Sequence, residues 1–136
     1  GASQRWDQDT AAFYMLNAAG GSLVQGNAKD WQWLQTDLAG LKGQKQVFVF
    51  LERRPFAGAE GFNSRPEADL LRRRLRETGE RLGALVWTFA PSTTGGFTWD
   101  DGVRYQSLQL STKGEAPRLA LVSIKDGKAT YTGLKY

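Results

Sequence analysis

The sequence predicts one α/β domain, in which a mixed sheet is covered by two helices and followed by an antiparallel meander. Two short runs rich in β-branched and aromatic residues, 46–51 and 83–87, are typical of buried strands. Segments with the apolar spacing of helices precede both runs. Asp-Gly turns between later apolar runs then predict hairpins near the C-terminus.

The N-terminal part predicts a strand followed by a helix. The apolar run 11–17 indicates the strand, and Ala18 to Ser22 reads as a turn. Asn27 is a suitable N-cap, and Asp30 would lie in the first turn of the helix. One face of this helix carries apolar residues at helical spacing, namely Trp31, Leu34, Leu38 and Leu41. Gly43 is the expected stop.

A second helix is predicted between the two buried strands. Residues 55–62 read as a loop, after which Ser64 and Glu67 have the spacing of a capping box, in which each would bind the other's backbone N–H. Pro66 is tolerated in a first turn. The apolar face of the helix carries Ala68, Leu71 and Leu75, and its expected end is near Gly79.

The last third of the chain predicts antiparallel strands. Residues 97–99 and 103–105 flank the turn Asp100-Asp101-Gly102. Residues 119–124 and 129–132 flank a second turn at 125–128.

Composition limits the chemistry that this chain can perform. Its 136 residues predict a single domain over 1–136 and carry a net charge of +4. The chain contains neither cysteine nor histidine. Disulfides, thiolate zinc sites and Ser-His or Cys-His nucleophiles are therefore excluded. No run of residues approaches the ~20 apolar positions of a membrane span.

The basic residues are concentrated between positions 53 and 81. This stretch has eight arginines against five acidic residues. Carboxylates lie four residues from arginines in the pairs Asp69–Arg73, Arg73–Glu77 and Glu77–Arg81. We therefore interpret the stretch as a solvated helix face with ion pairs, and we do not expect nucleic acid as a partner.

Five segments, in order, carry a resemblance to a known family. They are Phe13-Tyr14-Met15-Leu16-Asn17, Asp30-Trp31-Gln32-Trp33-Leu34, the strand and loop 47–56, the strand and loop 84–91, and Asp101-Gly102-Val103-Arg104-Tyr105. With these segments the chain resembles the C-terminal half of calcineurin-like metallophosphoesterases. The resemblance implies half of an α-β-β-α sandwich, and a domain that is the C-terminal part of a longer chain.

The same resemblance marks the positions of a lost metal site. Glu52, followed by Arg53 and Arg54, stands where that family has the first histidine of one loop. The segment that contains Thr88, Phe89 and Pro91 stands where it has Gly-His-x-His. The replacements do not suit a two-metal centre, so we assign no catalytic residue and no metal ligand and expect no cofactor. We expect Glu52 to form a salt bridge with a neighbouring arginine.

These observations favour a degenerate, non-catalytic domain with a structural, binding or assembly role. One sheet of a sandwich has an inner face that must be covered. Alternation of Phe48 and Phe50, and of Leu85 and Trp87, predicts an apolar inner face on the two buried strands. The expected partner is the upstream half of the same protein or a second copy in a homodimer.

Two alternatives stay open. A metal-dependent phosphoester hydrolase would need its other ligands in an upstream half, with Mg²⁺ or Mn²⁺ at a carboxylate such as Glu52. Binding of a phosphate- or sugar-bearing ligand without turnover would use Arg53, Arg54, Trp87 and Trp99. The absence of cysteine weakly favours an exported protein.

Overall fold

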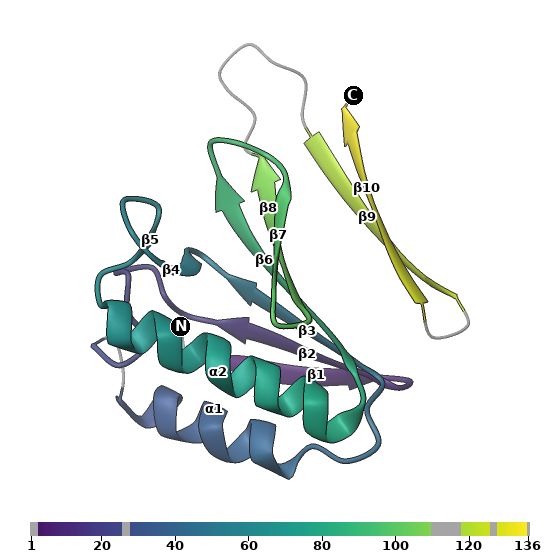
Figure 1. The fold of residues 1–136 in the computed structure, drawn as a ribbon, viewed down its shortest axis with the longest axis horizontal. Helices are drawn as coiled ribbons and strands as arrows, with labels where there is room; N and C mark the ends of the chain where they lie inside the picture. The colour runs from purple at the N-terminus through teal and green to yellow at the C-terminus, as the bar shows by residue number, and fades with distance from the viewer. Residues whose placement is uncertain (1–2, 26–27, 110–117, 126–127, 136) are drawn as a thin grey trace.

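A computed structural model describes residues 3–25, 28–109, 118–125 and 128–135 (Figure 1). Its main element is a six-stranded sheet with the order β1-β2-β3-β6-β8-β7. The strands of this sheet are β1 (Gln4–Gln8), β2 (Ala11–Leu16), β3 (Gln46–Leu51), β6 (Leu85–Ser92), β8 (Val103–Gln109) and β7 (Phe97–Asp100). The remaining elements are α1 (Ala28–Gly40), α2 (Arg65–Leu82), β4 (Arg54–Ala57), β5 (Gly61–Phe62), β9 (Arg118–Lys125) and β10 (Lys128–Lys135).

The sheet is mixed, as the sequence predicts. β2, β3, β6 and β8 are parallel to one another, whereas β1 and β7 are antiparallel edge strands. Together with two helices, this arrangement confirms the predicted α/β class. Neither helix is long and apolar enough to cross a membrane.

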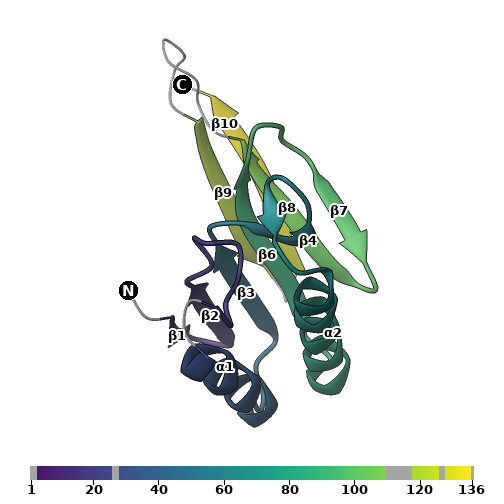
Figure 2. The same cartoon turned by 90° about the vertical axis from the view of Figure 1, so that its left-hand side faces the viewer.

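Both helices cover the same face of the sheet. The chain passes from β2 through α1 to β3, and from β3 through α2 to β6, moving in one direction across the sheet. Because such crossovers are right-handed, they place both helices on one side (Figures 1 and 2). Leu34 and Leu38 of α1 and Leu71 and Leu75 of α2 are buried there. The opposite face of the sheet has no helix over it among the described residues.

The first helix agrees with its predicted face but not with its predicted end. Leu34, Leu38 and Leu41 are buried, while Trp31 is half-buried. The helix ends at Gly40, three residues before Gly43, and Gly43 adopts a φ of 81° in the connection to β3. The predicted N-cap, Asn27, lies outside the described residues.

The second helix starts at the predicted cap and continues beyond the predicted end. The hydroxyl of Ser64 accepts a hydrogen bond from the backbone N–H of Glu67. Gly83, with a φ of 62°, ends the helix in the left-handed conformation. Gly79 lies inside the helix, where a Cβ would stand 3.0 Å from Cγ2 of Val86. The glycine therefore allows α2 to approach β6 closely, and does not stop the helix.

Both predicted hairpins form, but they do not make one continuous antiparallel meander. The first hairpin forms, with Asp101 and Gly102 at φ values of 48° and 82°. Its second strand, β8, inserts between β7 and β6 and pairs in parallel with β6. The second hairpin, β9–β10, is a separate two-stranded sheet, and its turn at 126–127 lies outside the described residues.

Three short strands were not expected from the sequence. β4 and β5 occupy the predicted loop 55–62. β1 turns into β2 through Asp9, which has a φ of 54°. The guanidinium of Arg5 and the hydroxyl of Tyr14 both donate to Oδ2 of Asp37, at 3.0 and 2.6 Å, and so attach β1 and β2 to α1. Burial, together with this carboxylate, raises the pKa of Tyr14.

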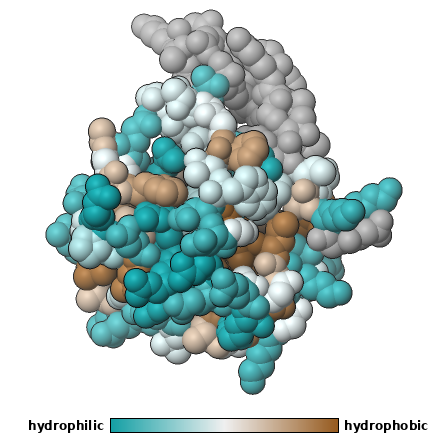
Figure 3. Space-filling model, viewed as in Figure 1, coloured by the Kyte–Doolittle hydropathy of each residue, from teal (hydrophilic) through white to brown (hydrophobic). Residues whose placement is uncertain are grey.

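The arginines of α2 make different ion pairs from those predicted. Arg72 pairs with Asp69 and with Asp100, whereas Arg74 pairs with Glu77 and Arg76 with Asp101. The pairs to Asp100 and Asp101 connect the helix to the turn between β7 and β8. Hydrophilic residues accordingly gather over the helices (Figure 3).

Candidate functional site

The resemblance directs attention to the edge of the sheet where the parallel strands end. Glu52 follows β3 directly, and its side chain is exposed to solvent. Its carboxylate accepts a hydrogen bond of 2.6 Å from the backbone N–H of Ala18, in the loop after β2. The expected salt bridge to an arginine is absent from the ion pairs of the residues that the structure describes. The Glu52 carboxylate therefore links the connection after β3 to the backbone of the loop after β2.

The two arginines after Glu52 also bind the chain itself. Arg53 donates to the carbonyl oxygens of Ala19 and Gly61, at 3.2 and 3.4 Å. Arg54 is the first residue of β4, and its guanidinium lies 5.1 Å from the centre of the Phe56 ring. These contacts hold the β3–β4 connection in place.

Thr88, Phe89 and Pro91 lie inside a strand, not in a loop after it. β6 continues to Ser92 because β8 pairs with it from Val86 to Ser92. Thr88 and Phe89 are buried, with 2% and 3% of their surface exposed. The pairing of β6 with β3 ends at Phe89, so Pro91 sits beyond it, where a missing N–H is tolerated. The segment from Thr88 to Pro91 is thus extended backbone.

A further carboxylate at this edge was not foreseen. Glu60, between β4 and β5, accepts hydrogen bonds from the hydroxyl of Ser92 and the backbone N–H of Thr93, both at 3.0 Å. Hydrogen bonds from the Thr93 side chain, from the Thr93 backbone and from Ser92 lower the pKa of Glu60. No local sequence pattern signals this contact, because it joins positions more than thirty residues apart.

The carboxylates of this edge are dispersed. Within the described parts of the chain, no three carboxylate side chains lie close enough together to hold a metal ion. Glu52 and Glu60 each act as a hydrogen-bond acceptor between loops.

The predicted ligand contacts fall on two sides of the sheet. Arg54 stacks on Phe56, and Phe56 packs against Tyr105, which belongs to the core under the helices. Trp87 lies in the second buried cluster, on the opposite side, and Trp99 shares its cross-strand row. The structure therefore separates Arg53 and Arg54 from the two tryptophans.

The helix-free side of the sheet carries aligned rows of large side chains, and we call it the aromatic face. Strand register aligns one residue from each strand in a first row, which consists of Trp6, Phe13, Phe48, Trp87, Arg104 and Trp99. A second row contains Met15, Phe50, Phe89, Gln106 and Phe97. The predicted apolar set Phe48, Phe50, Leu85 and Trp87 belongs to this face, as expected.

Neighbouring rings of the aromatic face are in direct contact. Trp6 stacks on Phe13 with ring centres 5.3 Å apart, and Phe50 stacks on Phe89 at 5.0 Å. Phe48 contacts Phe13, Trp87 and Phe89 at 5.3 to 6.4 Å. A continuous layer of rings thus extends from the edge strand β1 to β6.

At the other edge, Arg104 replaces a ring in the first row. Its guanidinium lies 3.9 Å from the centre of the Phe97 ring and 4.5 Å from that of Trp87. Two hydrogen bonds to the side-chain oxygen of Gln106, at 3.0 and 2.8 Å, orient it. Cation–π interactions with these two rings stabilise the guanidinium of Arg104 within the aromatic surface.

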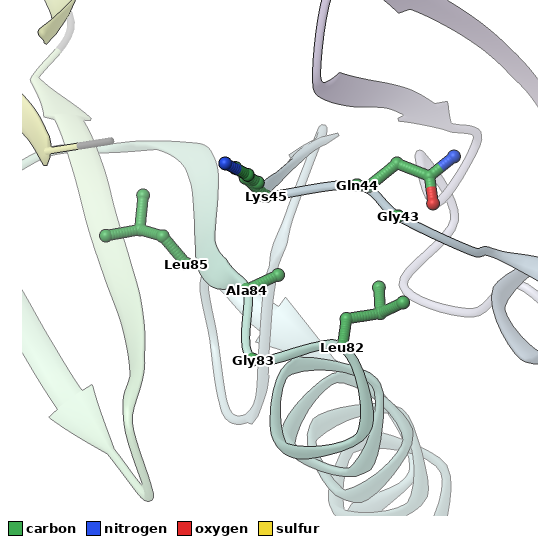
Figure 4. A pocket seen from close by; sticks show the side chains of 7 residues that line it. All are labelled: Gly43, Gln44, Lys45, Leu82, Gly83, Ala84 and Leu85. Atoms are coloured by element: carbon green, nitrogen blue, oxygen red, sulfur yellow. The ribbon is translucent and has the colours of Figure 1, made fainter. Parts of the chain in front are cut away.

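A hollow of about 620 Å³ lies at the opposite end of the sheet, where β3 and β6 begin (Figure 4). It is lined by Gly43, Gln44, Lys45, Leu82, Gly83, Ala84 and Leu85. In Figure 4 the polar ends of Gln44 and Lys45 point in opposite directions. Ligand sites have polar groups that converge, so this hollow does not have the form of one.

Comparison with known proteins found neither a family model nor a curated protein that matches this sequence.

Proposed function

We propose that this chain is a non-catalytic assembly domain, similar to the C-terminal half of calcineurin-like metallophosphoesterases, which uses its aromatic face to pack against a second β-layer. The observation that carries the proposal is the pair of cross-strand rows on the side without helices. Parallel sheets are normally covered on both faces. The second layer comes from an upstream segment of the protein or from another copy.

The exposure of large apolar residues supports this role. Six large apolar side chains are exposed among the described residues, and they are Trp6, Met15, Val24, Phe97, Trp99 and Ile124. Four of them, Trp6, Met15, Phe97 and Trp99, belong to the two rows of the aromatic face. Apolar surface that is concentrated on one face is typical of interaction sites.

The contacts at the carboxyl edge of the sheet support a role without turnover. Phe89 and Pro91 offer no proton-transfer or metal-binding group, and Thr88 is buried within β6. The nearest carboxylates, Glu52 and Glu60, already bind backbone N–H groups.

Catalysis is tested with a chromogenic phosphodiester in the presence of Mn²⁺ or Mg²⁺. We expect no turnover above the rate of buffer with the same metal, because the described residues do not assemble a metal-binding group at this edge. A Glu52→Ala variant is assayed beside the wild type. Turnover by the wild type that disappears in this variant would overturn the non-catalytic assignment and restore the hydrolase alternative.

The aromatic face is tested with the dye ANS, whose fluorescence rises on apolar surfaces. In dilute solution we expect the folded chain to bind the dye, and Met15→Lys to reduce binding because it places a charge in the second row. Val24→Lys is the matched control, since Val24 is 42% exposed and Met15 48%, but Val24 lies outside both rows. Equal effects of the two substitutions would argue against the face as the apolar site.

A further inference from the structure

The existing cover of the aromatic face is incomplete. In the first row, Phe48 and Trp87 are only 2% exposed, whereas Trp6 and Trp99 at the two ends are 43% and 53% exposed. The β9–β10 hairpin lies on the helix-free side, and its Ala129 packs against the aromatic cluster (Figures 1 and 2). The hairpin therefore covers the middle of the row and leaves both ends open, namely the strip over β1 and β2 and the edge strand β7.

Strand spacing gives the size of the gap. Neighbouring strands lie ~4.8 Å apart, so six strands are about 29 Å wide and a hairpin covers about 10 Å of that width. A second hairpin placed beside the first would extend the cover over β1 and β2, where Trp6 and Met15 are exposed.

The hairpin itself has the character of a covered element. The sequence of β9, RLALVSIK, is apolar at consecutive positions, a pattern typical of strands buried on both faces. A hairpin of two strands is only marginally stable when it stands alone in water. Thr130 pairs with Ser123, next to the Ala129–Ile124 pair, and both residues are exposed. Because successive side chains of a strand point to opposite faces and Ala129 packs on the sheet, Thr130 and Ser123 lie on the side of the hairpin that faces away from it.

We propose that a second copy of this chain extends the cover over β1 and β2 by reciprocal packing of the hairpins. This inference rests on the proposed function and names its partner. Around a two-fold axis parallel to the hairpins, each copy places its β9–β10 hairpin beside that of its partner and over the partner's β1 and β2. The two hairpins form a middle layer between two aromatic faces, with all four helices outside.

The area of such an interface is at the lower limit for a specific, reversible dimer. A hairpin of eight-residue strands measures about 10 by 26 Å, or roughly 250 Å² on one side. Two such contacts, each burying surface on both copies, remove about 1,000 Å² in total, which meets the lower bound for a specific interface.

Charge also suits a second copy. Arg104 is the one charged residue in the two rows, and it is stacked between rings, so the aromatic face presents little charge to the partner's hairpin. The β9–β10 turn is flanked by exposed Lys125 and Lys128, while exposed Asp9 lies in the turn between β1 and β2. Figure 1 shows the end of β9, the start of β10 and the connection from β1 to β2 at the same end of the sheet. Rotation about a two-fold axis parallel to the hairpins leaves this end of both copies on the same side of the dimer. Lys125 and Lys128 of each copy therefore approach Asp9 of the other copy.

Sedimentation velocity on the complete chain over about 1 to 100 µM tests the proposal. We expect a concentration-dependent dimer. Met15→Lys, in the open strip, and Thr130→Lys, on the outer side of the hairpin, should each raise the dissociation constant at least about tenfold. Val24→Lys, at a similarly exposed apolar position outside the rows, should leave the constant unchanged. Circular dichroism confirms that each variant is folded.

A wild type that stays monomeric over this range overturns the inference, and so does a dimer that Val24→Lys weakens as much as Met15→Lys does. A monomer that still binds ANS through the aromatic face leaves the proposed function standing and rejects only the second copy as partner. A monomer whose dye binding is indifferent to Met15→Lys rejects both.

Discussion

Replacing Trp87 with alanine is expected to lower the free energy of unfolding by about 3 to 5 kcal/mol, the usual range for removing a buried tryptophan. Trp87 is 2% exposed and contacts Phe48, Phe89 and the guanidinium of Arg104. Its removal leaves a cavity at the centre of the first row, beneath the β9–β10 hairpin. Chemical denaturation followed by circular dichroism measures the loss.

Trp99→Ala is the matched control, because it removes the same side chain from the same cross-strand row. Trp99 is 53% exposed, so its loss should cost less than about 1 kcal/mol. Equal costs at the two positions would mean that the aromatic face is uncovered along its whole width and that the hairpin does not lie over Trp87.

Glu67→Ala is expected to destabilise the chain by about 2 to 4 kcal/mol, since hydrogen bonds to a charged group contribute ~1.5–3 kcal/mol and their loss leaves buried donors unpaired. One oxygen of the buried Glu67 carboxylate accepts from the hydroxyl of Ser22 and from the backbone N–H groups of Leu23 and Val24, at 2.9 to 3.0 Å. The carboxylate thereby attaches the loop after β2 to the start of α2. Thermal and chemical denaturation measure the effect.

Glu77→Ala serves as the control on the same helix. Glu77 is exposed and pairs with Arg74 at 3.3 Å, so its removal should cost less than about 0.5 kcal/mol. Glu67→Gln keeps an acceptor oxygen for the loop and should fall between the two. A Glu67→Ala variant as stable as Glu77→Ala would show that the loop does not depend on this carboxylate.

Glu67 also shows how far a local pattern reaches. The capping-box spacing correctly predicted that the Ser64 hydroxyl would bind the backbone N–H of Glu67. It predicted wrongly that the Glu67 side chain would return to Ser64, because the carboxylate binds residues 22–24 instead. Their proximity arises only when the β2 loop and the α2 N-terminus meet in the folded chain.

The aromatic face likewise contains residues that the sequence predicted and residues that only strand pairing brings to it. Alternation along β3 and β6 was enough to predict an apolar inner face with Phe48 and Trp87 on it. Trp6 joins that face on β1, a strand that was not expected. Phe97 and Trp99 join it because β8 pairs with β6 and so brings the β7–β8 hairpin into the sheet, which no single segment signals.

The predicted loop at 88–91 failed for a related reason. Its sequence ends a buried run and contains Pro91, which locally favours a break. β8, which follows β7 in the sequence, pairs in parallel with this segment and keeps it extended to Ser92. A strand end was therefore determined by its partner and not by its own residues.

By itself the sequence determined both helices, the strands other than β1, β4 and β5, the cap of α2, and the lack of imidazole and thiol chemistry. These properties depend on residue identity and on apolar spacing within one segment. Only the tertiary structure decided that both helices share one face, that aromatic residues align in rows on the other, and that Glu52, Glu60 and Glu67 bind distant loops. The physical reason is that strand order, register and loop contacts depend on free energies shared between segments far apart in the chain, which no local pattern contains.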